Sequence, residues 1–211
     1  MGCDIHCWIE YRESGKPWVF QRRSPCGYCK TTGKLEARPD QNSSKRSKRK
    51  GKWEECFMCD GEGYTELHTE DDSYQDKDGK TVSVSYLAGG KAYRERNYVV
   101  FSLLAGVRDY EGHPEPLFEP RGVPDDATVE YAEIVEQDGV DGHSHSWLTL
   151  SEIEAGVMCA ADPLDTDPKQ TEMLVTELRG EFWDGLVVGQ MRPLAEKYGS
   201  DNVRIVFHFD N

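Results

Sequence analysis

Apolar and polar residues alternate at both ends of the chain, which predicts a β-strand at each end. In residues 3–11, Cys and Ile occupy every second position and polar or aromatic residues lie between them, the period of a half-buried strand. Residues 203–209 alternate in the same way. Residues 18–21 follow a turn with Gly and Pro and are expected to return beside the first strand, and residues 81–86 predict one more strand.

Apolar runs bounded by capping residues predict the helices. The run after Asn97 is expected to form a buried helix that ends at Gly106, because Asn caps helix N-termini and Gly adopts the left-handed conformation that ends them. A second helix is expected over about residues 127–137, with Asp126 as its N-cap.

The remaining segments predict further helices and two polar connections. Thr149 and Glu152 form the capping box of a short helix. Further helix is expected within residues 171–198, with breaks near Gly180, Gly185 and Pro193. Residues 70–80 are rich in Asp and are predicted to be a linker, and residues 139–146 are predicted to be a loop dense in Gly, His and Ser.

These elements predict an α+β fold, with a small β-sheet that includes the N- and C-terminal strands and is packed with helices. A chain of 211 residues with 37% hydrophobic residues is long enough for one core of ordinary size. The main domain is expected to comprise residues 1–23 and 67–211. Residues 24–66 differ in composition and are expected to form an inserted module.

Four cysteines in this module have the spacing of a metal site. Two Cys-x-x-Cys pairs, separated by 26 residues, are formed by Cys26, Cys29, Cys56 and Cys59. A spacer of two residues lets a tight turn direct two thiolates to one ion, and four thiolates complete the closed shell of a structural zinc site. An iron–sulfur centre and four unrelated buried thiols are the alternatives. A closed shell leaves no position for a substrate, so this site is not the expected catalytic centre.

The second cysteine pair belongs to a longer repeat. Residues Cys56 to Gly63 read Cys-x-x-Cys-x-Gly-x-Gly, and Cys26 to Gly33 match this phrase in part. The phrase resembles the cysteine-rich repeats of the DnaJ-type chaperones. The resemblance implies the geometry of a zinc-binding turn and does not imply chaperone activity.

Charge is divided unevenly along the chain. The sequence has 39 acidic and 25 basic residues and a net charge of −14, which argues against general binding to DNA or to an anionic membrane. Residues 21–66 carry a net charge of +4, whereas the remainder carries −18. The basic run Lys45–Lys52 could contact nucleic acid locally. It contains no aromatic residue to stack on bases, so a solvated loop is the favoured interpretation.

Other features of the composition bear on location. No stretch reaches the roughly 20 apolar residues that cross a bilayer, and the N-terminus lacks the pattern of a secretory signal. Seven cysteines, four of them in close pairs, favour metal binding in a reducing compartment over a framework of disulfides. We therefore expect a cytoplasmic protein that does not bind membranes.

Two histidine-containing pairs suggest a second site. Asp4 and His6 are two residues apart on the first predicted strand, and His143 and His145 have the same spacing. Residues at this spacing on a strand share one face, and imidazole with carboxylate suits zinc, iron or manganese. The two pairs could thus form a catalytic site with a second divalent metal, extended by the strand that carries His208 and Asp210. A purely structural role and the binding of a small anionic ligand are the alternatives.

Several phrases outside the cysteine module carry a family resemblance. They include Met1–His6, residues 96–98 and 104–108, Pro120–Asp126, His143–Leu150 and Arg204–Asn211. Together they resemble a largely uncharacterised family of small bacteriophage and prophage proteins. The resemblance implies a phage protein that acts in a bacterial cytoplasm. The family has a bulky aromatic residue where His208 stands, which argues against a ligand role for this histidine.

Two classes of function follow from these observations. The first is an accessory hydrolase that cleaves a phosphodiester or nucleotide, such as a host-defence signal, with Asp4, His6, His143 and His145 as metal ligands or as general acid and base. The ligand-binding candidates for this class are Arg108, Arg121 and Trp147. The second is a non-catalytic protein that binds or sequesters a nucleotide or a basic host protein and is braced by a structural zinc finger. The sequence leaves the choice between enzyme and binder open.

Overall fold

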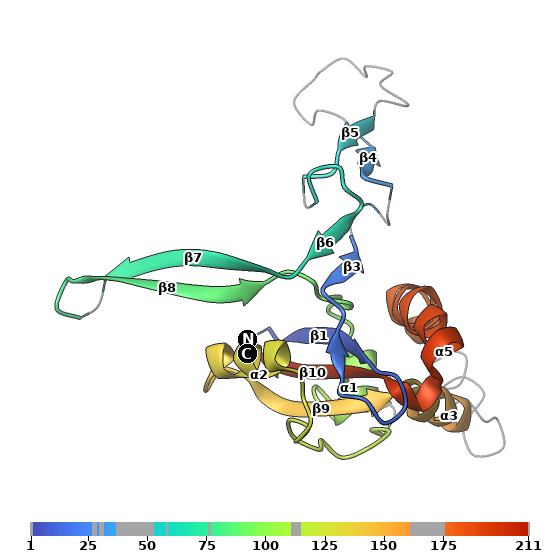
Figure 1. The fold of residues 1–211 in the computed structure, drawn as a ribbon. Coiled ribbons are helices and arrows are strands. Elements are labelled where there is room, and N and C mark those ends of the chain that lie inside the picture. The colour runs from blue at the N-terminus through green and yellow to red at the C-terminus, as the bar shows by residue number, and fades with distance from the viewer. Residues whose placement is uncertain are drawn as a thin grey trace.

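The computed structural model describes residues 2–26, 29, 32–36, 53–57, 59–75, 77–110, 115–160 and 176–210. Within these residues it has the predicted α+β fold, and the first and last strands pair in one sheet as expected. Figure 1 shows this sheet with helices around it, and two excursions that extend away from it.

The central sheet has four antiparallel strands in the order β2-β1-β10-β9. The strands are β1 (Asp4–Tyr11), β2 (Val19–Phe20), β9 (His143–Thr149) and β10 (Val203–Asp210). Strand β10 lies between β1 and β9, with His6 opposite His208. The two terminal strands predicted from alternation are confirmed, and so is the return strand expected at residues 18–21.

The loop predicted at residues 139–146 is wrong in its second half, where β9 begins at His143. A β-bulge explains the error. The register between β10 and β9 shifts between Phe207 and Phe209, and Ser144 has a left-handed φ of 51°. An extra residue at a bulge interrupts the alternation by which a strand is recognised in a sequence.

One face of the sheet forms the larger core. Its apolar residues pack against α1 (Tyr98–Ala105), α3 (Leu150–Ala160) and the π-helix η1 (Glu181–Met191). Both predicted ends of α1 are confirmed, because the Asn97 side chain accepts hydrogen bonds from two backbone N–H groups of the first turn and Gly106 has a φ of 63°. The capping box is confirmed as well, with reciprocal bonds between Thr149 and Glu152.

Helix α2 (Val129–Asp138) packs on the opposite face of the sheet, where Tyr131 and Ile134 contact Trp8 and Val206. The prediction that Asp126 caps this helix is wrong. Thr128 is the N-cap and accepts a hydrogen bond from the Tyr131 N–H. The Asp126 carboxylate instead binds Arg204 and the indole of Trp18.

The helical region after residue 176 is more continuous than expected. The π-helix η1 begins after Gly180, near a predicted break, but it runs through Gly185 without interruption. Pro193 lies in the first turn of α5 (Arg192–Tyr198), where a missing N–H costs little. A short 3₁₀ turn, η2 (Ser200–Asn202), leads into β10.

Two excursions extend from the sheet (Figure 1). The first carries two short strand pairs, β3 (Arg23–Pro25) with β6 (Tyr64–Glu66) and β4 (Lys34–Glu36) with β5 (Trp53–Glu55). The second is a ribbon of β7 (His68–Gln75) and β8 (Thr81–Ala88). The boundaries of the inserted module stay a prediction.

The linker predicted at residues 70–80 is wrong, because residues up to Gln75 belong to β7. Where its side chains are described, this strand is exposed on both faces, so no buried apolar residues mark it in the sequence. Among the residues that the structure covers, no helix has the length and apolar character needed to span a membrane.

Candidate metal centres

The four predicted cysteine ligands form one buried cluster. The Cys26 and Cys56 sulfur atoms are 3.8 Å apart, and those of Cys29 and Cys59 are 3.6 Å apart. All four Sγ atoms lie within 4.8 Å of one another. Four sulfur atoms placed tetrahedrally at about 2.3 Å from one ion would be about 3.8 Å apart. The cluster could therefore hold a metal ion.

Backbone hydrogen bonds hold the two cysteine pairs in a near-symmetric arrangement. The Cys26 N–H donates to the Gly63 carbonyl, and the Cys56 N–H donates to the Gly33 carbonyl, both at 2.9 Å. Each pair is thus fixed to the glycine that ends the other repeat. Gly33 has a φ of 68°, and a Cβ there would lie 1.9 Å from the Gly61 carbonyl oxygen. Only glycine fits this position, in agreement with the repeat seen in the sequence.

A row of three imidazoles crosses the central sheet. His6 of β1 stacks on His208 of β10, with ring centroids 4.9 Å apart and planes at 10°. His145 of β9 stacks on His208 at 5.0 Å and 25°. The fold thus places His6 of the first strand and His145 of the His-Ser-His segment on either side of His208.

The hydrogen bonds of His6 define its proton position. Its Nδ1 lies 2.8 Å from the Lys91 ammonium, which can only donate, so Nδ1 is the acceptor. Its Nε2 then donates to the Asp210 carboxylate at 2.9 Å. His208 bonds in a similar way through Nε2 to the Asp138 carboxylate, at 2.6 Å.

Three of these residues form a second group that could hold a metal. One ligand atom each from His6, His208 and Asp138 lie within 4.8 Å of one another. Two ligands on one ion at about 2.1 Å can be at most about 4.2 Å apart, which is close to the upper limit of 4.8 Å for this group. Asp138 is the last residue of α2, and the negative end of a helix dipole favours a cation there.

The environment favours neutral forms of His6 and His145 and a charged Asp138 carboxylate. Burial, followed by the Lys91 charge, lowers the pKa of His6. Burial, followed by His208, lowers the pKa of His145. Burial alone would raise the pKa of Asp138, but the hydrogen bond and charge of His208 outweigh it and the pKa is lowered. Neutral imidazole and ionised carboxylate are the forms that bind metals.

Two ring nitrogens in the row have no hydrogen-bond partner among the described residues. They are His145 Nε2 and His208 Nδ1, and both are buried. An unsatisfied buried polar group costs about 1–3 kcal/mol, so it calls for a structural explanation. A bound ion or ligand would supply one.

Two of the predicted site residues are placed differently. His143 stacks on Phe209, whereas His145 stacks on His208. Phe209 and His208 are successive residues of a strand and point to opposite faces, so the bulge at Ser144 separates the two histidines that were expected to share one face. Asp4 accepts two hydrogen bonds from Arg96, at 2.8 and 2.7 Å, and this pair is half exposed.

The predicted ligand-binding residues Arg108, Arg121 and Trp147 are not part of the histidine row. The Arg121 guanidinium forms two hydrogen bonds with the Glu152 carboxylate and lies 4.7 Å from the Trp147 ring. Arg108 donates to the Gly2 carbonyl at 3.2 Å. The basic run Lys45–Lys52 falls outside the described residues.

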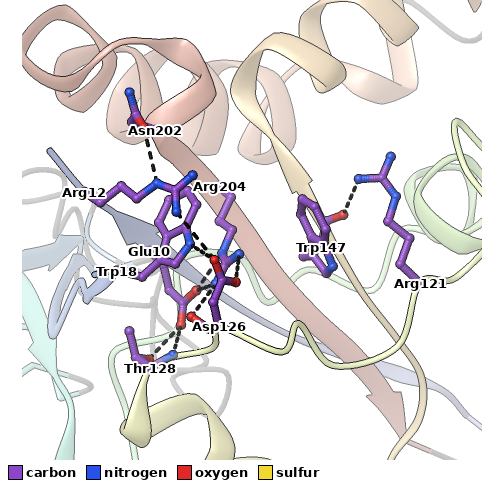
Figure 2. A network of polar contacts seen from close by, with 9 residues as sticks. All are labelled: Glu10, Arg12, Trp18, Arg121, Asp126, Thr128, Trp147, Asn202 and Arg204. Atoms are coloured by element: carbon purple, nitrogen blue, oxygen red, sulfur yellow. Dashed lines mark hydrogen bonds and ion pairs between the residues drawn. The ribbon is translucent and has the colours of Figure 1, made fainter. Parts of the chain in front are cut away.

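A second polar cluster, the Arg204 cluster, lies farther along the same face as the histidines (Figure 2). Arg204 donates to Glu10 at 2.7 Å and to the Asp126 carboxylate at 2.7 Å. The other Glu10 oxygen accepts from the N–H and the hydroxyl of Thr128, at 2.9 and 2.7 Å. The guanidinium also lies 3.9 Å from the Trp18 ring.

Two residues that contact the histidine row, Lys91 and Asp138, were not predicted from the sequence. The family resemblance argued against a third, His208. No local pattern marks Lys91, which follows a Gly-Gly turn, or Asp138, which ends a helix. The signal for His208 was present, because it shares a strand with Asp210 and pairs with the first strand. The family resemblance argued against it, yet His208 is the central ring of the row.

The structure defines an α+β protein with a buried four-cysteine cluster that could hold a metal ion. No family model, curated protein or solved structure matches the chain.

Proposed function

We propose that this protein is a metal-dependent hydrolase that cleaves a phosphodiester or a nucleotide. The observation that carries the proposal is the convergence of His6, His208 and Asp138, whose ligand atoms lie within 4.8 Å of one another at the end of α2. In this proposal they hold one divalent metal. Such an ion lowers the pKa of a bound water and stabilises the charge that develops on phosphate oxygens.

The neighbouring residues take distinct roles in the proposal. Asp210 accepts a hydrogen bond from His6 Nε2 and so fixes the tautomer and orientation of that ring, as carboxylates do beside metal-bound histidines. The metal would then take the place of the Lys91 ammonium at His6 Nδ1. His145 lies against His208 and is outside the ligand group. Its Nε2, which has no hydrogen-bond partner within the described part of the chain, makes it the candidate for general acid or base.

We also propose that the four-cysteine cluster holds zinc in a structural role. Sulfur–sulfur distances of 3.6 and 3.8 Å suit a tetrahedral thiolate site, and four cysteines fill every position of the ion. The resemblance to phage proteins suggests the biological setting of the enzyme. In that setting it would act in the bacterial cytoplasm on a nucleotide of the host, for example a defence signal.

The test combines metal analysis with an activity assay. The purified protein should contain two metal equivalents and hydrolyse bis(p-nitrophenyl) phosphate with added Mn²⁺ or Zn²⁺. His6→Asn and Asp138→Asn should each retain one equivalent and lose at least 100-fold in rate. Asp141→Asn, at an exposed acid close to Asp138 in the chain, is the matched control and should change neither value. One equivalent and no hydrolysis in the unaltered protein would refute the proposal.

A second candidate function is the binding of a basic protein, and the β7–β8 ribbon favours it. The ribbon extends away from the sheet, and Glu70, Asp71 and Asp72 are consecutive and exposed on it (Figure 1). A ribbon of two strands gains little stability alone, which suits an element that docks to a partner. Binding of a lysine-rich peptide that is lost on neutralising these three residues would support this function. Unchanged binding would count against it.

A further inference from the structure

A short segment after β8 is fixed beside the histidine row by backbone contacts. Gly89 and Gly90 have positive φ values of 81° and 61°, and a Cβ on Gly89 would lie 2.3 Å from the Glu66 carbonyl oxygen. The Ala92 N–H then donates to the Cys7 carbonyl at 2.8 Å, so the segment runs along β1. The Trp8 indole also donates to the Gly89 carbonyl. Lys91 and Arg94 are therefore held in defined positions.

These two side chains are partly buried cations that have no carboxylate in ion-pair contact among the residues the structure covers. The Lys91 ammonium contacts His6 Nδ1, and Arg94 donates to the Thr65 hydroxyl and the Lys91 carbonyl at 3.3 and 3.4 Å. By contrast, carboxylates pair with Arg12, Arg121 and Arg204, three other partly or fully buried arginines of the sheet region. The carboxylates of Asp138, Asp210 and Asp4 act on Lys91 only from beyond ion-pair distance, so direct contacts to an anion are still open at the two cations.

Both residues also line two cavities. The first has a volume of about 640 Å³ and is lined in addition by Tyr93, Gly185 and Gln190. The second has a volume of about 610 Å³ and lies toward the cysteine module, with Tyr64 and Thr65 in its wall. Cavities of this size suit a small-molecule ligand such as a nucleotide.

We propose that Lys91 and Arg94 form a phosphate-binding subsite where the two cavities meet, next to His6. This inference rests on the proposed hydrolase function and names the group of the substrate that the enzyme holds. An arginine fork and a lysine together suit the oxygens of one phosphate.

The acidic residues in the cavity walls favour a small ligand over a nucleic acid strand. Asp60 and Glu62 lie at the wall of one cavity, and Glu181 and Asp184 lie at the wall of the other. These carboxylates would repel the repeated phosphates of a nucleic acid strand more strongly than a single phosphate held by the two cations. The ligand class is therefore a phosphate ester of a small molecule.

The test measures binding of inorganic phosphate and pyrophosphate to the purified full-length protein by calorimetry, so it requires no turnover. Arg94→Gln and Lys91→Gln should each raise the Kd at least tenfold, and Arg94→Lys should have an intermediate effect. Arg192→Gln removes an exposed arginine that is paired with Glu154 and lines neither cavity, and it should leave the Kd unchanged. Far-UV circular dichroism of each variant confirms that it is folded.

The outcomes separate this proposal from the hydrolase proposal. Phosphate binding that depends on Arg94 and Lys91 supports the subsite even if no hydrolysis or second metal is found. If the protein hydrolyses phosphodiesters but these variants bind phosphate and substrate as the unaltered protein does, the subsite is overturned and the enzyme stands. Absence of phosphate and pyrophosphate binding overturns the subsite as well.

Discussion

The two polar clusters on one face of the central sheet differ in how completely their polar atoms are satisfied. In the Arg204 cluster, the guanidinium and the Glu10 carboxylate are almost fully buried and bonded to each other, to Asp126 and to Thr128. In the histidine row, His208 Nδ1 and His145 Nε2 are buried without a partner among the described residues. Helix α2 spans both, since Thr128 at its start bonds Glu10 and Asp138 at its end bonds His208.

This contrast separates a structural cluster from a candidate functional site. A buried polar network in which every group has a partner fixes the positions of the elements that contribute to it. An unsatisfied nitrogen gives no such benefit and costs stability, so it is more readily explained by a ligand that completes it. The Arg204 cluster thus anchors the start of α2, and the row at the other end of the helix is the place to look for chemistry.

The largest effect is expected from breaking the Arg204 cluster. Arg204→Met leaves the Glu10 carboxylate buried without its cation, and loss of one partner of a buried pair costs about 3–5 kcal/mol. The free energy of unfolding, measured by urea denaturation, should fall by this amount. The double variant Arg204→Met, Glu10→Leu should recover part of the loss, but not all, because the Thr128 N–H loses its acceptor.

An exposed ion pair provides the control for this variant. Arg192→Met breaks the pair with Glu154, whose side chains are 45% and 30% exposed, and should cost less than about 1 kcal/mol. If both variants had equal effects, the Arg204 cluster would not be the structural anchor that its burial indicates.

A smaller change in stability is expected when a divalent metal binds at the histidine row. A divalent ion that binds only the folded state stabilises it by about 2.7 kcal/mol when its free concentration is 100 times the Kd. Mn²⁺ added to protein with its cysteine cluster already loaded should therefore raise the Tm. Asp138→Asn should abolish this rise, whereas Asp141→Asn, at an exposed acid nearby, should preserve it. A Tm rise that persists in Asp138→Asn would place the metal elsewhere.

The features that could be predicted from the sequence are those that a local pattern marks. The cysteine cluster was predicted in full, because its spacing is local and few other structures use two Cys-x-x-Cys pairs. The strands at the chain ends were predicted because apolar residues line one face of each. The placement of His6 and His145 in one row, on either side of His208, was expected only as a possibility, since strand order is set by packing of the whole chain.

What the sequence could not reveal depends on long-range contacts or on broken patterns. Lys91 and Asp138 reach His6 and His208 from segments that are far away in the chain, and nothing local marks them. The bulge at Ser144 interrupts the alternation, so the start of β9 was predicted to be a loop. It also places His143 and His145 on opposite faces of the sheet. Asp126 was expected to cap α2, but a buried arginine competes more strongly for its carboxylate than a helix N-terminus does.

A still smaller change in stability is expected from replacing the central ring of the row. His208→Phe removes an unsatisfied buried nitrogen but also the bond to Asp138, which is partly exposed and can be solvated. These effects oppose each other, so the free energy of unfolding should stay within about 1 kcal/mol of the unaltered value. The second metal equivalent should nevertheless be lost. A loss of several kcal/mol would instead show that His208 is a structural residue like Arg204.

The smallest predicted effect is a pH dependence of the stability that Glu152 contributes through its partly exposed pair with Arg121. Burial opposes ionisation of Glu152, but the bonds from Arg121 and Thr149 outweigh it, and the pKa of Glu152 is lowered. A lowered pKa in the folded state gives stability that is present above the ordinary Glu value of about 4.3 and is lost as the pH falls through the folded value. Glu152→Gln should thus be less stable than the unaltered protein at pH 7, by less than about 1 kcal/mol because the pair is partly exposed. The difference should shrink in urea denaturation series taken at pH 5, 4 and 3, whereas Glu136→Gln, at an exposed position, should show no such trend. A difference that stays constant with pH would mean that Glu152 acts through its shape in the capping box and not through its charge.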